Sequence, residues 1–270
     1  MTKMKPMKIP FSPPDMSEEE AKEVREAILS GWITTGPRTK KLETQISEYV
    51  GTAKTVCLSS ATASMEMVLH LLDIQPEDEV IVPAYTYTAT ASVTQHVGCQ
   101  LVMVDSQKHN VEMDYEQLEQ AITERTKVIM PVDIAGIVAD YDRVYEIVER
   151  KKNLFRPANA LQAKIGRIVV AADCAHAFGA VRKGKMAGAI ADFSAFSFHA
   201  VKNFTTAEIT QILIEMTYHV GPPFSCQQVE VATGNLMYLQ KLYKTEWIYL
   251  RYEETTTESR INLTGKHLRV

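Results

Sequence analysis

The chain has 270 residues, of which 46% are hydrophobic and 23% are charged, and its formal net charge is −4 at pH 7. This composition is ordinary for a globular protein with a large core, and it excludes a disordered or fibrous protein. Because no block of Lys and Arg stands apart, we expect no nucleic-acid partner; because no apolar run approaches about 18 residues, we expect no membrane-spanning helix.

The four cysteines lie far apart, with neither a Cys-x-x-Cys pair nor the spacing of a metal site. The N-terminal stretch MTKMKPMKIPF is polar and broken by prolines, which is unlike a signal peptide. We therefore expect a reduced, cytoplasmic protein that binds no metal.

Short β-branched runs alternate with longer segments of helical periodicity, a pattern typical of parallel strands joined by helices. In chain order, we expect helices at 16–31 and 40–51, a strand at 55–60, a helix at 61–74, a strand at 80–82 and a helix from about 88 onward. The next elements expected are a strand at 100–105, a helix at 114–123, a strand at 127–133, a helix at 140–152 and a strand at 166–173. Residues 153–166 are irregular and indicate a surface insertion.

The first candidate site lies where the strand at 55–60 passes into the next helix. Ser60, Ala61 and Thr62 start this helix with small side chains and hydroxyls, where backbone N–H groups and the helix dipole can bind an anion such as phosphate. Taken alone, these residues favour plain helix capping, since Ser and Thr are preferred caps.

Tyr85 and Tyr87 follow the strand at 80–82, within PAYTYTAT. Ligands of open α/β sheets gather at the carboxyl ends of the strands, so an aromatic ring here can stack on a planar cofactor, Tyr87 being the better candidate. The alternative is that both rings pack on the helix that follows.

Asp173 ends the strand GRIVVAAD, and His176 follows three residues later. A carboxylate at the edge of a buried sheet needs a cation or strong hydrogen-bond donors, and a protonated heterocyclic nitrogen would be such a partner. Asp173 could instead cap the turn CAHAF, and His176 could either face the same site or cap that turn.

Lys202 lies in FSFHAVKNFTT, where Phe196 and Phe198 indicate a buried strand end. A desolvated lysine has a lowered pKa and becomes a nucleophile for carbonyl groups. In the alternative, Lys202 is solvated and Ser197 forms only local hydrogen bonds.

Together, an anion-binding helix start, a stacking aromatic ring, a strand-end aspartate and a lysine are the components that hold pyridoxal 5′-phosphate. Lys202 would form the internal Schiff base, and Asp173 would keep the pyridine nitrogen protonated. These features predict a cofactor-dependent enzyme.

Four blocks carry a family resemblance: CLSSATASMEMVLHLLDI, EDEVIVPAYTYTATASV, ADCAHAFGA and FSFHAVKNFTTAE. They resemble the DegT/DnrJ/EryC1/StrS family of sugar aminotransferases, which make 3- or 4-amino sugars from nucleotide-linked keto sugars, and the resemblance covers residues from about 8 to 208. It implies an α/β fold of type I, with an aspartate-aminotransferase-like large domain whose mostly parallel central sheet is flanked by helices. It also implies a homodimer.

The resemblance assigns roles to single residues. Lys202 matches the Schiff-base lysine, Asp173 the partner of the pyridine nitrogen, and Tyr87 the residue stacked on the ring. The residues expected to contact the cofactor are Ser60, Ala61, Thr62, Tyr87, Asp173, His176, Ser197 and Lys202, the phosphate contacts being Ala61, Thr62 and Ser197. The segment GWITTGP matches a segment near the sugar nucleotide, and its candidate residues are Trp32, Thr34 and Thr35.

The wording LSSATA and SFHA-x-KN is shared with aminotransferases of the UDP-4-amino-4-deoxy-L-arabinose type. This resemblance implies that glutamate gives the amino group, becoming 2-oxoglutarate, and that a nucleotide-linked keto sugar of the UDP-4-keto type receives it. Related sugar dehydratases carry histidine in place of the Schiff-base lysine, so Lys202 argues against that reaction.

The resemblance ends at about residue 208. Family members continue with a Gly-Gly strand, a long helix and a smaller domain, whereas residues 209–270 show weak periodicity apart from the strand-like ITQILIEMTYHV. We therefore expect a cofactor-binding large domain at 1–208 and a divergent segment at 209–270, which arose from a truncated or altered reading frame or belongs to a compact variant. The alternative function is an inactive cofactor-binding remnant or a regulator without turnover.

Overall fold

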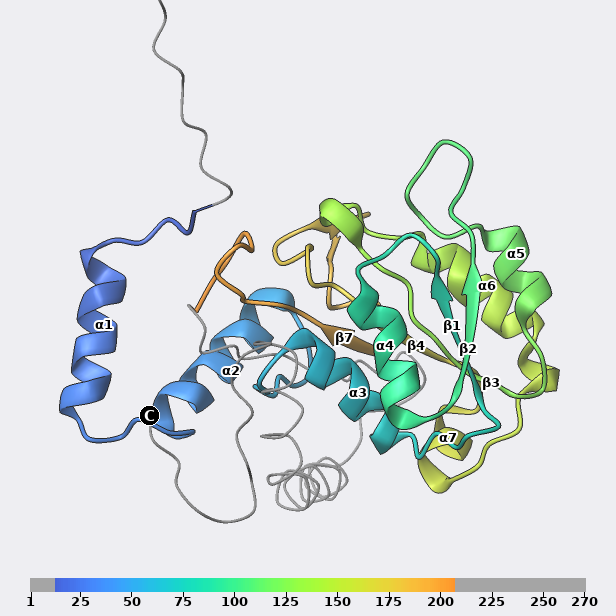
Figure 1. Ribbon diagram of the computed structural model, residues 1–270, viewed down its shortest axis with the longest axis horizontal. Coiled ribbons are helices and arrows are strands. Elements are labelled where there is room, and N and C mark those ends of the chain that lie inside the picture. Colours follow the sequence, from blue (N-terminus) through green and yellow to red (C-terminus); the bar gives the residue numbers. More distant parts are fainter. Residues whose placement is uncertain (1–12, 207–270) are drawn as a thin grey trace, which may run out of the picture. The chain divides into compact units, whose positions relative to one another are not determined.

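The computed structural model of the chain describes residues 13–206 (Figure 1). The predictions for residues 209–270, including the strand-like stretch after Glu208, lie outside the described residues. No helix in the described range is long and apolar enough to cross a membrane.

The centre of the described chain is a five-stranded sheet in the order β2-β1-β3-β4-β7. All four neighbouring pairs are parallel. The strands are β1 (Glu79–Pro83), β2 (Gln100–Val104), β3 (Thr126–Ile129), β4 (Val169–Asp173) and β7 (Phe193–Ala195). Every residue of β1, β3, β4 and β7 is buried, as is usual for parallel strands covered on both faces. This arrangement confirms the predicted mostly parallel α/β fold.

The helices are α1 (Glu18–Leu29), α2 (Pro37–Val50), α3 (Ala61–Leu71), α4 (Thr88–Val97), α5 (Tyr115–Ala121), α6 (Tyr141–Arg150) and α7 (Ala160–Ile165). Helices α1, α2 and α3 precede the first strand in the chain, and α4, α5, α6 and α7 lie between strands (Figure 1). Two short 3-10 turns, η1 (Ile134–Gly136) and η2 (Lys152–Leu154), and a small hairpin of β5 (Val181–Arg182) and β6 (Lys185–Met186) complete the list.

Local signals explain where several helices begin and end. Ser17 and Glu20 form a reciprocal capping box at the start of α1, and Gly51 ends α2 in the left-handed conformation at φ 82°. Tyr87 is the residue before α4, so the predicted start at Thr88 is confirmed.

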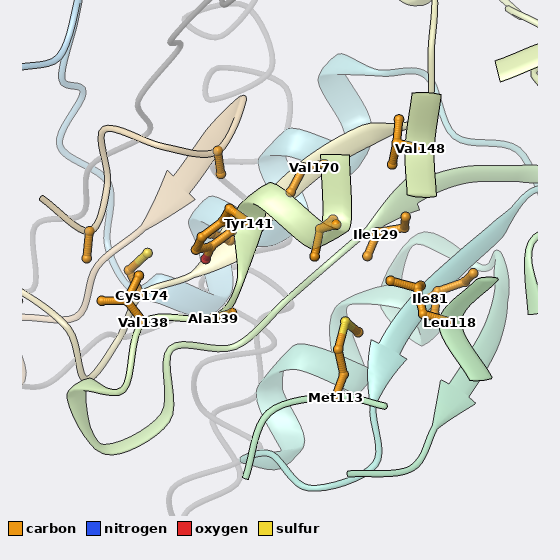
Figure 2. Close-up of a cluster of buried hydrophobic side chains, with 14 of the residues drawn as sticks. Ile81, Met113, Leu118, Ile129, Val138, Ala139, Tyr141, Val148, Val170 and Cys174 are labelled. Carbon is orange, nitrogen blue, oxygen red and sulfur yellow. The ribbon is translucent and has the colours of Figure 1, made fainter. Parts of the chain in front are cut away.

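One face of the sheet forms a continuous apolar core (Figure 2). Alternate strand residues such as Ile81, Ile129 and Val170 pack there against Leu118 of α5 and Val148 of α6. Because side chains alternate along a strand, the intervening strand residues face the other side, where α3 and α4 contact the sheet. Helices therefore contact both faces of the sheet.

The predicted strand at 55–60 is wrong: this segment is not a strand in the structure. Thr55 and Leu58 are buried, but the Cys57 N–H donates to the Glu43 carboxylate of α2 at 2.9 Å instead of to a neighbouring strand. A β-branched run becomes a strand only where a partner supplies a ladder, and no described segment does so here.

The prediction of an irregular insertion at 153–166 is also corrected, because this stretch contains η2 and α7. The side-chain amides of Asn159 and Gln162 each donate to the carbonyl oxygen of Leu72 at 2.7 Å. These bonds satisfy a carbonyl left open at the end of α3, so the segment is fixed to the body of the fold.

Candidate functional site

Tyr87, Asp173, His176 and Lys202 lie at or after the ends of the parallel strands β1, β4 and β7. Asp173 is the last residue of β4 and is paired in register with Ala195, the last residue of β7. Val132, beyond β3, forms a single parallel bridge with Asp173. Because parallel strands end on the same edge of the sheet, the loops that follow them share one site.

Asp173 is almost fully buried, and burial raises the pKa of its carboxyl. Its Oδ2 accepts a hydrogen bond from the Thr90 hydroxyl at 2.7 Å, and its Oδ1 accepts one from the Ala175 N–H at 3.0 Å. These bonds favour the ionised form, as do the nearby charges of His176 and Lys202. The site therefore holds a buried carboxylate whose direct hydrogen-bond donors are neutral.

Thr90 is a site residue that the sequence did not reveal. It is fully buried in the first turn of α4, and its hydroxyl also lies 2.8 Å from that of Thr86. A threonine at the start of a helix is typical of a cap, and nothing in its local sequence indicates a partner 83 residues away.

Lys202 lies on the loop after β7 and is half-buried. Burial lowers the pKa of its amine, and the carboxylate of Asp173 acts in the opposite direction. The backbone around it is fixed, since the Lys202 N–H donates to the His199 carbonyl at 2.9 Å and the Asn203 amide donates to the Phe178 carbonyl at 2.6 Å. Lys202 is thus a partly desolvated amine on an ordered loop beside a carboxylate.

An aromatic cluster centred on Phe178 supports this loop. The ring of Phe178 contacts those of Tyr49, Phe196, Phe198 and Phe204, with centroids 5.0–5.4 Å apart. Contacts of this geometry add to the stability gained from apolar burial. Phe178 therefore joins the turn after Asp173 to both ends of the lysine loop, and the sequence did not single it out.

His176 is exposed at the edge of the site, and its Nδ1 accepts a hydrogen bond from the Ala135 N–H at 3.3 Å. Partial loss of hydration and the nearby charge of Lys202 lower the pKa of its ring, while Asp173 opposes them. The histidine therefore contacts the loop after β3, which answers the question of whether it merely caps its own turn.

The start of α3 has the geometry of a capped helix. The Ser60 hydroxyl accepts from the Ala63 N–H at 3.1 Å, whereas the N–H groups of Ala61 and Thr62 belong to the first turn and have no acceptor within the helix. Capping and anion binding are therefore compatible here. The Ser197 hydroxyl accepts a long bond of 3.4 Å from the His199 N–H.

The two tyrosines after β1 are exposed, at 57% for Tyr85 and 73% for Tyr87. Neither ring is buried against α4, which argues against the packing alternative. The exposed ring of Tyr87, the residue before α4, is available for stacking on a ligand.

The segment predicted to contact a sugar nucleotide precedes α2 and is exposed. Trp32, Thr34 and Thr35 are exposed and precede α2, where the Trp32 indole N–H donates to the Thr35 carbonyl at 3.2 Å. Tyr49, which contacts Phe178, lies near the other end of α2, about 18 Å away at 1.5 Å per residue. The contact of these three residues with a sugar nucleotide stays a prediction.

The described residues 13–206 contain no group of three or more His, Cys, Asp or Glu side chains placed to bind a metal ion. The groups described above for the candidate site are an amine, an imidazole, the hydroxyls of Thr90 and Ser197, a helix start and a buried carboxylate.

Comparison with known proteins identifies relatives for this arrangement. The model of the DegT/DnrJ/EryC1/StrS aminotransferase family matches residues 14–213. The chain is 40% identical over 200 residues to a UDP-4-amino-4-deoxy-L-arabinose--oxoglutarate aminotransferase from Shewanella sediminis. The aligned stretch covers 74% of this chain and 47% of that protein.

Among solved structures, the chain is similar to Spr1654 of Streptococcus pneumoniae, assigned as a sugar aminotransferase, in its PLP form. The identity is 52% and the TM-score 0.79, over 83% of this chain and 56% of that one. An aminotransferase from Psychrobacter cryohalolentis is 26% identical with a TM-score of 0.67, over 77% of this chain and 50% of that one. The chain spans about half the length of these relatives.

Proposed function

Because the chain belongs to the DegT/DnrJ/EryC1/StrS aminotransferase family, we propose that the protein is a sugar aminotransferase that uses pyridoxal 5′-phosphate. The observation that carries this proposal is the meeting of a buried carboxylate, Asp173, with a partly desolvated amine, Lys202, at the ends of neighbouring strands. The expected cofactor residues remain predictions that direct labelling can test.

The donor set at the strand ends fits this cofactor. Asp173 is buried, and its hydrogen-bond donors among residues 13–206 are neutral, so a protonated ring nitrogen would complete its surroundings. The open N–H groups at the start of α3, with Ser197, suit a phosphate, and the exposed ring of Tyr87 suits a planar heterocycle. When bound, pyridoxal phosphate supplies an electron sink and carries the amino group between substrates.

Each residue has a defined task in this proposal. The Nζ of Lys202 would hold the cofactor in the resting enzyme. Once free, the same amine would accept the proton from the α-carbon of the amino donor and deliver it to the former aldehyde carbon of the cofactor. Its lowered pKa favours the neutral amine that this task requires. Asp173 stabilises positive charge on the ring nitrogen, and Thr90 orients the Asp173 carboxylate.

For the substrates, we propose glutamate as amino donor and a nucleotide-linked keto sugar of the UDP-4-keto type as acceptor. The similarity to the Shewanella sediminis enzyme, whose name includes both a UDP-linked amino sugar and oxoglutarate, supports this choice.

We also propose a homodimer. Helix α1 buries none of its residues within the described chain, and its apolar side chains Val24, Ile28 and Leu29 are exposed.

The test begins with cofactor binding by the full chain. Pyridoxal phosphate is titrated while its absorbance is followed, the complex is reduced with borohydride, and the labelled peptide is identified by mass spectrometry. We expect the label on Lys202 and none in Lys202→Ala. The control is Lys183→Ala, because Lys183 pairs with Asp142 on the surface away from the site. A label that persists in Lys202→Ala would contradict the assignment.

Turnover is tested separately from binding. Glutamate should convert the bound cofactor to its pyridoxamine form with release of 2-oxoglutarate, and a panel of keto-sugar nucleotides should convert it back. Labelling of Lys202 without this conversion would favour the alternative, a cofactor-binding protein that does not turn over.

A further inference from the structure

Asp133 is a completely buried carboxylate that the proposed chemistry does not use. Its Oδ1 accepts hydrogen bonds from the Ala139 N–H at 2.9 Å and the Tyr141 hydroxyl at 3.0 Å, and its Oδ2 accepts one from the Cys174 thiol at 3.2 Å. Ala139, Tyr141 and Cys174 lie together in the apolar core (Figure 2). A carboxylate in such surroundings is costly, and burial raises its pKa to about 6.

The bonds of Asp133 fix both ends of one loop. At the start, the Asp133 N–H donates to the Asp173 carbonyl oxygen at 2.9 Å, which ties the loop to the end of β4. At the far end, its carboxylate holds Ala139 and the first residue of α6. The residues between them, 134–138, include the short turn η1 and are held between two fixed points.

Within this loop, Ala135 has a strained backbone. Its φ of 53° and ψ of 23° are left-handed, a conformation rare for residues other than Gly, Asn and Asp. In this conformation its N–H meets Nδ1 of His176. Strain of this kind persists only where the surroundings impose it, and here the two anchor points of Asp133 do so.

The contact decides which nitrogen of His176 carries the proton. Since Nδ1 accepts the Ala135 N–H, the neutral ring has its proton on Nε2 and presents that N–H as a donor. Lys202 and Asp173 both act electrostatically on this ring, so the donor belongs to the same site.

We propose that Asp133 is a positioning residue: it holds the loop at 134–139 so that Ala135 fixes His176 as the neutral Nε2–H tautomer, which donates to the bound cofactor. The first half concerns the protein without ligand. The second half rests on the proposed function, because it requires pyridoxal phosphate in the site.

The first experiment reads the tautomer of His176 by ¹⁵N NMR in the full chain without cofactor, with His176→Gln to identify its signals. We expect the Nε2–H form near pH 7 and a mixture of tautomers in Asp133→Ala. Should Asp133→Ala fail to fold, Asp133→Asn has nearly the same shape but offers Cys174 no charged acceptor. Asp192→Asn is the matched control, since Asp192 is also buried but pairs with Arg167.

The second experiment measures pyridoxal phosphate affinity in a double-mutant cycle of Asp133→Asn and His176→Phe. We expect each single variant to lose about tenfold and the double variant to lose no more than His176→Phe alone, because the two residues act through one contact. His176→Gln should restore affinity, since its carbonyl can accept from Ala135 while its amide donates to the ligand.

The outcomes separate the two proposals. An Nδ1–H tautomer in the wild type, an unchanged tautomer in both Asp133 variants, or additive losses in the cycle would overturn the positioning role. A tautomer that depends on Asp133 in a protein that binds no pyridoxal phosphate would keep the role of Asp133 on His176, overturn donation to the cofactor and refute the proposed function.

Discussion

At the scale of single residues, the site depends on hydrogen bonds to buried carboxylates. Asp173 receives its side-chain bond from Thr90, and Asp133 receives three bonds, one of them from Cys174. Removing a donor from a buried charge costs more than removing one from a neutral group. Conservative substitutions of the donors therefore give the clearest tests.

Thr90→Val removes the hydroxyl that bonds Asp173 while keeping the shape of the side chain. We expect the pKa of Asp173 to rise further and cofactor affinity to fall about tenfold or more, since a hydrogen bond to a charged group contributes about 1.5–3 kcal/mol. Titration of cofactor absorbance measures this. The control is Thr94→Val: Thr94 is equally buried on α4, but its hydroxyl bonds only the Ala91 carbonyl. Equal losses in both variants would contradict the assigned role of Thr90.

Asp133 should make the stability of the cofactor-free protein depend on pH. Its pKa in the folded state, about 6, exceeds the value of about 3.9 for an unfolded aspartate, so the folded state binds the proton more tightly. The contribution of Asp133 to stability is then fully present below about pH 4, and about 3 kcal/mol of it is lost as the pH rises through about 6.

Asp133→Asn cannot ionise and should lose this dependence. The free energy of unfolding of both proteins is measured in denaturant at pH 4.5 and 7. We expect the value of Asp133→Asn minus that of the wild type to be larger at pH 7 than at pH 4.5. Parallel curves for the two proteins would show that Asp133 ionises as easily when folded as when unfolded.

At the scale of elements, helix starts and side-chain clusters position the chemistry. Ser60→Ala removes the cap of α3, and we expect a loss of about 1 kcal/mol in stability together with weaker binding of the phosphate-bearing cofactor. Ser17→Ala is the control, because Ser17 caps α1 in the same way but lies outside the site. Thermal unfolding and absorbance titration measure the two effects, and unchanged cofactor affinity in Ser60→Ala would remove α3 from the phosphate site.

Phe178 should determine the order of the lysine loop. Phe178→Leu removes four ring contacts, and we expect faster hydrogen exchange at 196–206 and a loss of about 2 kcal/mol in stability. Phe155→Leu is the control, because Phe155 is buried beside Lys127 and outside this cluster. Equal exchange at 196–206 in both variants would argue that the loop is ordered by other contacts.

Elements also show what the sequence could predict. Helix starts at Thr88 and strand ends at Asp173 follow from local patterns, and both are confirmed. The strand expected at 55–60 is wrong because a strand requires a distant partner. Helix α7 is not predicted because the side-chain amide of Gln162 bonds the Leu72 carbonyl, 90 residues away in the sequence. The same holds for the site: its lysine and aspartate have local signals, whereas the partnership of Thr90 with Asp173 has none.

At the scale of the whole described molecule, the two edges of the sheet differ. β2 is partly exposed, with Met103 at 60%, whereas all residues of β7 are buried although it pairs with β4 alone among the described strands. The catalytic candidates gather toward the covered edge, where β4 and β7 end. Water is thus excluded from the strands that carry Asp173 and lead to Lys202.

The strand order β2-β1-β3-β4-β7 also determines when, during folding, the ligand-binding site becomes complete. Parallel neighbours come together only after long loops close, which makes such sheets slow to form, and the site needs residues from Ser60 to Lys202. A ligand that binds only the finished sheet slows unfolding and leaves the rate of refolding unchanged, which stopped-flow mixing with and without pyridoxal phosphate can measure. A refolding rate that rises with the ligand would mean that part of the site forms early. If the refolding rate does not change, the cofactor concentration determines how long each molecule stays folded, and the sequence alone determines how fast it folds.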